Sequence, residues 1–290
     1  MLQQIQDTIL EQHEIALSVY RIDLMHPQVS GNKWYKLKYN LQAAKQQGYQ
    51  TLLTFGGAYS NHIYATAAAG KMHGFQTIGV IRGEAHTPLN PTLQFAADYG
   101  MKLHYLDRTT YRDKKSPEVL EMLQQTFGSF YLIPEGGSNA LAVKGCTEIL
   151  TELDTTFDVI TTACGTGGTL AGLVAHLPDH QQVLGFPALK GGDFLYNDTE
   201  DLLDAYYDAF NISREATRDR YQLMTDYHFG GYAKKKPPLL SFMDDFTQRH
   251  QIPLEWIYTG KMFYGLYDLI KNNYFRPCTK IVALHTGGIR

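Results

Sequence analysis

The sequence predicts an α/β fold with mostly parallel sheets flanked by helices, and three observations support this prediction. Short runs rich in apolar and β-branched residues alternate along the chain with longer helical patterns. Glycines stand at many of the junctions between them. The chain has 290 residues, 44% of them hydrophobic, which is enough to bury the core of one large or two modest domains. Strands that alternate with helices in this way favour a parallel sheet covered on both faces.

The expected elements follow one another along most of the chain. The first helix is expected over residues 32–47, with Leu37, Leu41 and Ala44 on one face. Further helices are expected at 61–73, 92–99 and 118–125. The expected strands are 51–55, 75–81, 101–106, 130–133, 158–163, 183–186 and 280–285. The segment 196–238 is richer in charge and tyrosine, and we expect helices and loops there that decorate the sheet.

Charge and cysteine content argue against several classes of protein. The net charge of −3 gives no bulk attraction to nucleic acid or anionic membranes. No apolar stretch approaches the length of a membrane span, and acidic residues near the N-terminus argue against a secretory signal. Three cysteines without a CxxC spacing predict neither a disulfide framework nor a cysteine-rich zinc site. We therefore expect a cytoplasmic protein without a metal site.

Three glycine-bearing turns stand between an expected strand and an expected helix, at residues 56–62, 135–139 and 165–169. Each places backbone N–H groups at the positive end of a helix, which suits an anion. None has the lysine of a P-loop or the glycine spacing of a dinucleotide site, so a phosphate monoester fits better than a nucleotide. Tight turns also use glycine for steric reasons, and we expect at least one of the three to be structural.

Lys33 opens the first expected helix directly after Gly31 and Asn32. A cation is disfavoured at this electropositive helix end, so the pKa of the lysine should fall and its neutral amine should become available as a nucleophile. Lys36 and Lys38 lie nearby, and spacing alone does not single out Lys33.

Taken together and in order, six motifs resemble those of the 1-aminocyclopropane-1-carboxylate deaminase / D-cysteine desulfhydrase family. These are pyridoxal-phosphate (PLP) enzymes of fold type II, related in fold to the tryptophan synthase β chain. The resemblance runs nearly end to end. It rests on Gly31-Asn32-Lys33, Gly57-Ala58-Tyr59-Ser60-Asn61-His62, Glu135-Gly136-Gly137-Ser138, Gly165-Thr166-Gly167-Gly168-Thr169, Tyr258-Thr259-Gly260-Lys261 and His285-Thr286-Gly287-Gly288.

The resemblance implies an architecture and a set of cofactor contacts. Two α/β domains would hold PLP in the cleft between them, a larger one from residues 1–38 plus 147–290 and a smaller one from 39–146, in a homodimer. Lys33 would carry the cofactor as a Schiff base and later move the α-proton. The turn from Gly165 through Thr166, Gly167 and Gly168 to Thr169 would hold the phosphate. Asn61 would hydrogen-bond the ring hydroxyl, and Thr286 would lie at the pyridine nitrogen.

The resemblance also implies which residues contact a small amino-acid substrate. Ser60 and the N–H groups around Asn61 and His62 would hold its carboxylate, and Tyr258 would face it or stack near the ring. Each of these residues is also compatible with a purely structural role. Ser60 is equally suited to N-cap the following helix, and Tyr258 is one of 20 tyrosines, a residue type that commonly packs with its hydroxyl in water.

Two positions favour one reaction within the family. The cyclopropane-opening deaminases resemble Tyr-Glu-Gly-Lys where this chain has Thr259 in second place, and they tend to carry leucine where it has Thr286. A hydroxyl at the pyridine nitrogen makes the ring a weaker electron sink, which suits elimination. The resemblance therefore implies β-elimination from a D-amino acid, with D-cysteine yielding pyruvate, ammonia and sulfide.

Four alternatives stay open. Two are enzymes, the cyclopropane-carboxylate deaminase itself and a lyase for another D-amino acid. The third is a non-catalytic ligand-binding α/β protein, against which Lys33 argues because a binder needs no Schiff-base lysine. The fourth is a nucleotide-binding α/β protein that uses the glycine turns for a diphosphate.

Overall fold

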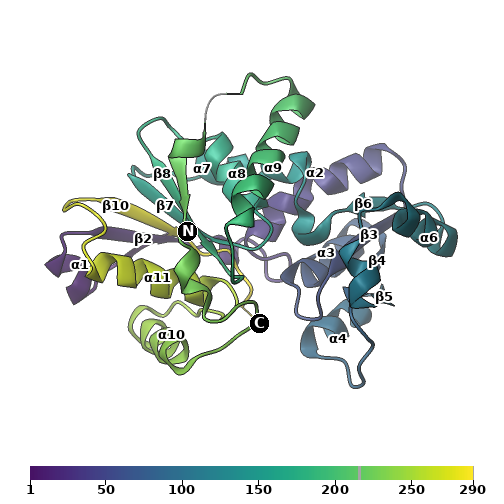
Figure 1. Ribbon diagram of the computed structural model, residues 1–290, viewed down its shortest axis with the longest axis horizontal. Coiled ribbons are helices and arrows are strands. Elements are labelled where there is room, and N and C mark those ends of the chain that lie inside the picture. The colour runs from purple at the N-terminus through teal and green to yellow at the C-terminus, as the bar shows by residue number, and fades with distance from the viewer. Residues whose placement is uncertain (215–216, 290) are drawn as a thin grey trace.

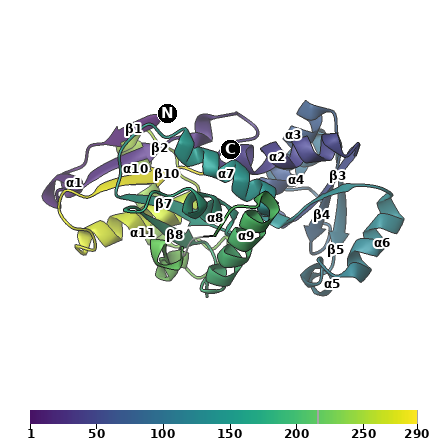
Figure 2. The ribbon, with the colours of Figure 1, turned by 90° about the horizontal axis from the view of Figure 1, so that it is seen from above.

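The structure is a computed structural model that describes residues 1–214 and 217–289, and it has two lobes, each built on its own sheet (Figure 1 and Figure 2). The predicted α/β class is confirmed. Among the described residues, no helix is both long and apolar enough to cross a bilayer.

The larger lobe contains a six-stranded sheet in the order β1-β2-β10-β7-β8-β9. Only the pair β1–β2 is antiparallel. The strands are Leu2–Ile5 (β1), Ala16–Tyr20 (β2), Val159–Cys164 (β7), Gln182–Pro187 (β8), Tyr221–Leu223 (β9) and Lys280–Leu284 (β10). The α-helices of this lobe are Thr8–Gln12 (α1), Ala140–Thr151 (α7), Gly168–Ala175 (α8), Phe194–Phe210 (α9), Pro237–His250 (α10) and Thr259–Lys271 (α11).

Alternation along the strands divides the core of this lobe in two. Ile160, Val183 and Val282 pack with side chains of α7, α8 and α9. The neighbouring strand residues Val159 and Leu184 pack with α1, α10 and α11 on the opposite face. Successive side chains of a strand point to opposite faces, so strands buried on both faces are apolar throughout.

The smaller lobe contains a four-stranded sheet in the order β5-β4-β3-β6, and all of its pairs are parallel. Its strands are Thr51–Gly56 (β3), Gln76–Arg82 (β4), Met101–Leu106 (β5) and Tyr131–Ile133 (β6). Its helices are Asn32–Gln46 (α2), Asn61–His73 (α3), Pro91–Asp98 (α4), Arg108–Arg112 (α5) and Pro117–Phe127 (α6). The carboxyl ends of all four strands therefore meet at one edge of the sheet.

Every strand and helix that the sequence predicted by residue range is present, with its ends shifted by at most two residues. The prediction missed β1, β2, α1, α5, α10 and α11, and it expected α7 and α8 only as helices after the glycine turns, without bounds. It was also incomplete for 196–238, where three residues form β9 and extend the sheet. A three-residue strand is too short to show a period of two. The proposed domain boundaries, 39 and 146, fall within α2 and α7, which pack on each other, and they stay a prediction.

Candidate functional site

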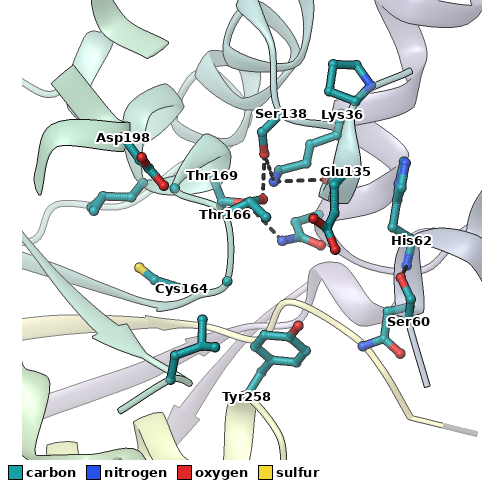
Figure 3. Close-up of a pocket in the computed structure, with 18 of the residues that line it drawn as sticks. Lys36, Ser60, His62, Glu135, Ser138, Cys164, Thr166, Thr169, Asp198 and Tyr258 are labelled. Atoms are coloured by element: carbon teal, nitrogen blue, oxygen red, sulfur yellow. Dashed lines mark hydrogen bonds between the residues drawn. The ribbon is translucent and has the colours of Figure 1, made fainter. Parts of the chain in front are cut away.

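A pocket of about 460 Å³ lies between the two lobes, at the carboxyl ends of strands from both sheets (Figure 3). Parallel α/β sheets commonly bind ligands at this edge. Every residue to which the resemblance assigned a role lines this pocket, except Gly168, which is buried beside it at the start of α8. The lining residues of this set are Lys33, Ser60, Asn61, His62, Gly165, Thr166, Gly167, Thr169, Tyr258 and Thr286. Residues from distant parts of the chain thus surround one space.

Lys33 lies in the first turn of α2, as the sequence predicted. Gly31 precedes this turn with φ = 65°, and a Cβ there would lie 2.0 Å from the Thr286 carbonyl oxygen, so this close approach requires glycine. The Lys33 Nζ lies 3.5 Å from the carbonyl oxygen of Gly136. Burial, and next the charge of Lys36, lower the pKa of Lys33 well below its usual value of 10.5. The lowered pKa favours the neutral, nucleophilic form of the amine.

Lys36 is a buried lysine of the same helix, to which the sequence assigned no role. It lies one turn after Lys33 on the same face of α2, and this spacing of three was the available signal. Its Nζ donates to the Ser138 hydroxyl at 3.1 Å and to the Gly136 carbonyl at 3.3 Å. A Cβ on Gly168 would lie 3.0 Å from that Nζ, so Lys36 directs its amine at the start of α8.

The turn between β7 and α8 forms a polar cradle. Gly167 takes φ = 74° as the N-cap of α8, and Gly168 begins the helix. The Thr166 and Ser138 hydroxyls lie 2.6 Å apart, and Thr169 Oγ1 accepts a hydrogen bond from Asn32 Nδ2 at 2.8 Å. Backbone N–H groups, hydroxyls and the Lys36 amine therefore converge at a helix N-terminus, where an anion is favoured.

The loop between β3 and α3 carries the residues predicted to bind a carboxylate. Ser60 is the N-cap of α3, and its Oγ accepts the N–H groups of His62 at 3.2 Å and Ile63 at 3.3 Å. Ser60 therefore has the structural role of an N-cap, and its O–H can still donate a hydrogen bond to a ligand. Asn61 also lines the pocket, and a Cβ on Gly288 would lie 2.7 Å from its Nδ2.

The backbone N–H and the ring of His62 both form hydrogen bonds within the protein, whereas the resemblance implied that this region binds the substrate carboxylate. Its backbone N–H already bonds Ser60, and its ring Nε2 lies 2.8 Å from Thr54 Oγ1. Because the Thr54 hydroxyl donates to the Ile133 carbonyl at 2.8 Å, His62 Nε2 is the donor in their contact. Burial, followed by the charges of Lys33 and Lys36, lowers the pKa of His62 well below 6.5. The ring is therefore neutral and supports the loop.

Tyr258 faces the pocket from the start of α11, and a Cβ on Gly165 would lie 3.1 Å from its ring (Figure 3). Burial, and then the hydroxyl of Tyr232, raise the pKa of Tyr258 well above 10.0. The Tyr258 hydroxyl therefore keeps its proton at neutral pH and can donate a hydrogen bond. Tyr232 follows Gly230-Gly231 in the segment expected to form helices and loops, where no local pattern singled it out.

Glu255 is the second residue near Tyr258 that the sequence missed. Its buried carboxylate accepts the N–H groups of Ile257, Tyr258 and Thr259, each at 2.7 Å. Thr259 does not line the pocket, since it is buried and its hydroxyl accepts the Glu255 N–H at 3.1 Å. The carboxyl group of Glu255 therefore lies beside Tyr258, where Thr259 cannot supply one. The threonine at position 259 does not by itself define the environment of the tyrosine.

Comparison with known proteins assigns the family. The family described as "Pyridoxal-phosphate dependent enzyme" matches residues 11–287. This chain belongs to that family. A protein of Pyrococcus horikoshii named "Putative 1-aminocyclopropane-1-carboxylate deaminase" is 31% identical over 285 residues, which cover 95% of this chain and 86% of that protein.

Two further relatives agree with this assignment. The "Bifunctional D-cysteine desulfhydrase/1-aminocyclopropane-1-carboxylate deaminase, mitochondrial" of Arabidopsis thaliana is 28% identical over 297 residues, covering 94% of this chain and 72% of that protein. A solved structure described as an ACC deaminase homologue has a TM-score of 0.86 and 30% identity, and the match covers 100% of this chain and 89% of that one. This pyridoxal-phosphate-dependent enzyme thus lies among relatives named as deaminases and desulfhydrases.

The residues of the pocket fit PLP. The cradle at α8 suits the phosphate, because its glycines leave backbone N–H groups accessible and a Cβ at Gly168 would collide with Ser138 at 2.6 Å. The neutral Lys33 amine suits the aldehyde. Within the described part of the chain, no cluster of three or more His, Cys, Asp or Glu side chains could hold a metal ion.

Proposed function

We propose that this PLP-dependent enzyme catalyses β-elimination from a small D-amino acid, with D-cysteine yielding pyruvate, ammonia and sulfide. The observation that carries the proposal is that the Lys33 amine, whose pKa is lowered by burial, lies in the same pocket as the α8 cradle. In this proposal, Lys33 binds the cofactor covalently and Lys36, Ser138 and the turn 165–169 hold its phosphate. Asn61 contacts the ring hydroxyl, and Thr286 lies at the ring nitrogen.

Different residues of the pocket would bind the substrate, orient it and transfer its protons. When bound, PLP holds the substrate amine and withdraws electrons from Cα. Ser60 and Asn61 orient the carboxylate at the start of α3, and His62 supports their loop. Lys33 Nζ takes the proton from Cα, which requires its lowered pKa. The Cβ–S bond breaks with its electron pair on sulfur, and the Tyr258 hydroxyl donates a hydrogen bond to the departing hydrosulfide.

Two features bear on the choice of substrate. Elimination needs a Cα proton, which Lys33 can remove, and the hydroxyl of Thr286 near the ring nitrogen suits that reaction. Glu255 beside Tyr258 favours a second candidate, the opening of 1-aminocyclopropane-1-carboxylate, because an acid near the tyrosine helps to tune it for a strained ring without a Cα proton. The names of the relatives include both activities.

Colour and covalent attachment test the cofactor proposal. The purified protein should absorb as a yellow Schiff base, and borohydride should fix the cofactor to the peptide that contains Lys33. Lys33→Ala should lose the absorbance and the activity. Lys38→Ala is the matched control, since Lys38 lies on the same helix and pairs with Glu148 outside the pocket. Cofactor attached to another lysine would refute the assignment.

A substrate panel tests the reaction. The yellow protein should release pyruvate and sulfide from D-cysteine faster than from L-cysteine. Release of 2-oxobutyrate from 1-aminocyclopropane-1-carboxylate at a higher kcat/KM would instead establish the second candidate. A yellow protein that converts none of these substrates would favour a binding role.

Three further expectations remain proposals. The homodimer rests on the family resemblance, and light scattering during size-exclusion chromatography measures it directly. The division into domains 1–38 plus 147–290 and 39–146 can be tested by limited proteolysis. The cytoplasmic location rests on cysteine usage and can be tested by fractionation; Cys146, Cys164 and Cys278 are unpaired.

A further inference from the structure

Arg82 is a cation of the pocket that the proposed reaction does not use. It is the last residue of β4, at the sheet edge that faces the cleft, and it lines the pocket. Its Nη2 lies 3.7 Å from the position that a Cβ on Gly57 would take, and Gly57 begins the loop that leads to Ser60. The guanidinium is therefore next to the loop proposed to hold the substrate carboxylate.

Two of the neighbouring charges on this wall form an ion pair with each other. Lys114 pairs with Glu135 at 3.1 Å, and Glu135 also accepts the Tyr111 hydroxyl at 2.9 Å. Arg82 has no carboxylate within 4.0 Å in residues 1–214 and 217–289. Its guanidinium makes a cation–π contact with the Tyr111 ring, whose centroid lies 5.9 Å from Cζ. Among the described residues, Arg82 is therefore a cation of this wall without a counter-ion. Lys115 also lines the pocket without an ion pair, but its charge acts on the pocket carboxylate of Asp198.

Each anion that the proposed function requires has a place elsewhere. The cofactor phosphate has the α8 cradle and Lys36, and the α-carboxylate has the hydroxyl and backbone groups at Ser60 and Asn61. A guanidinium stays charged at all working pH values and presents planar, paired donors that match a carboxylate, sulfonate or phosphate. Arg82 is thus left for a third anion, within reach of the substrate side chain.

We propose that Arg82 forms a subsite for a negatively charged β-substituent of the substrate, an inference that rests on the proposed β-elimination. The Cα proton goes to Lys33, the Cβ–X bond breaks with its electron pair on X, and X leaves as an anion. Water then converts the released 2-aminoacrylate to pyruvate and ammonium. D-cysteine fits this class at the moment of departure, when its sulfur leaves as hydrosulfide.

Binding of two isosteric amino acids tests the subsite without turnover. D-aspartate and D-asparagine differ in the charge at the end of the side chain, and both can be titrated against the cofactor absorbance of the holoenzyme. The wild type should bind D-aspartate more tightly. Arg82→Met should weaken D-aspartate binding by about 10- to 100-fold, the loss expected for a charge-assisted hydrogen bond, and change D-asparagine binding by only about twofold.

Arg112→Met is the matched control, because Arg112 is an exposed arginine of the same lobe that does not line the pocket. It should leave both dissociation constants at their wild-type values. Equal weakening of both ligands by Arg82→Met would assign Arg82 to the α-carboxylate and overturn the proposal. So would a wild-type enzyme that does not distinguish the two ligands. Failure of the β-elimination itself would show separately, as no pyruvate from D-cysteine.

Discussion

Gly168→Ala separates cofactor binding from folding. Alanine is ordinarily more stable than glycine in a helix by about 0.5–1 kcal/mol, and Gly168 is not among the glycines with positive φ. However, the added Cβ would lie 2.6 Å from Ser138 Oγ and 3.0 Å from Lys36 Nζ. Both groups must move out of the cradle. Losing one charge-assisted hydrogen bond to the phosphate costs about 1.5–3 kcal/mol, which weakens PLP binding about 10- to 150-fold.

The assay is a titration of the apoprotein with PLP, followed by the absorbance of the Schiff base, together with urea unfolding of the apoprotein. We expect weaker PLP binding at nearly unchanged stability. The double variant Gly168→Ala/Ser138→Ala removes the closer obstruction and should recover part of the affinity, as a non-additive pair. Unchanged PLP affinity in Gly168→Ala would refute the assignment of this turn to the phosphate.

Three other variants test the polar interior. Burial lowers the pKa of Lys33, so the unfolded chain binds more protons between that lowered pKa and 10.5. This group should therefore make apoprotein stability rise with pH across the window by up to about 1.4 kcal/mol per unit. In urea unfolding series Lys33→Met should remove this share of the rise and leave the share of Lys36 and Lys261, whose pKa values burial also lowers. Lys261→Met should destabilise the protein by about 1–3 kcal/mol, because the buried amine donates to two backbone carbonyls at 3.0 and 2.8 Å; an unchanged urea midpoint would contradict this. Asn90→Ala should lower the free energy of unfolding by about 1 kcal/mol, because it removes the side-chain cap of α4. It should also raise the KM for substrate, because the Asn90 amide donates to the Ala58 carbonyl in the loop that leads to Ser60. Asn90→Asp keeps the cap and should change only the KM.

Local sequence was enough to predict much of this site. The cap at Ser60 and the glycine turn before α8 act through neighbours in the chain, so their effects can be read from a few consecutive residues. Gly31 also opens a helix, but the close approach that requires glycine there is to the distant Thr286 carbonyl. The family motifs then indicated the cofactor, and the family match confirmed it. The spacing of Lys33 and Lys36 was visible as well, but spacing does not reveal which lysine faces a phosphate and which an aldehyde.

Other features depended on contacts between distant segments. Tyr232 meets Tyr258 within the larger lobe, and Arg82 lies near the Tyr111 ring within the smaller lobe, only because each fold brings distant segments to the edge of its sheet. Glu255 supplies the acid that position 259 lacks. The sequence by itself determined the local elements, the turns and the chemical types of the site, because capping, turn geometry and side-chain periodicity are short-range. Only the tertiary structure decided which charges are paired and which are free, since pairing depends on how separate sheets and helices pack.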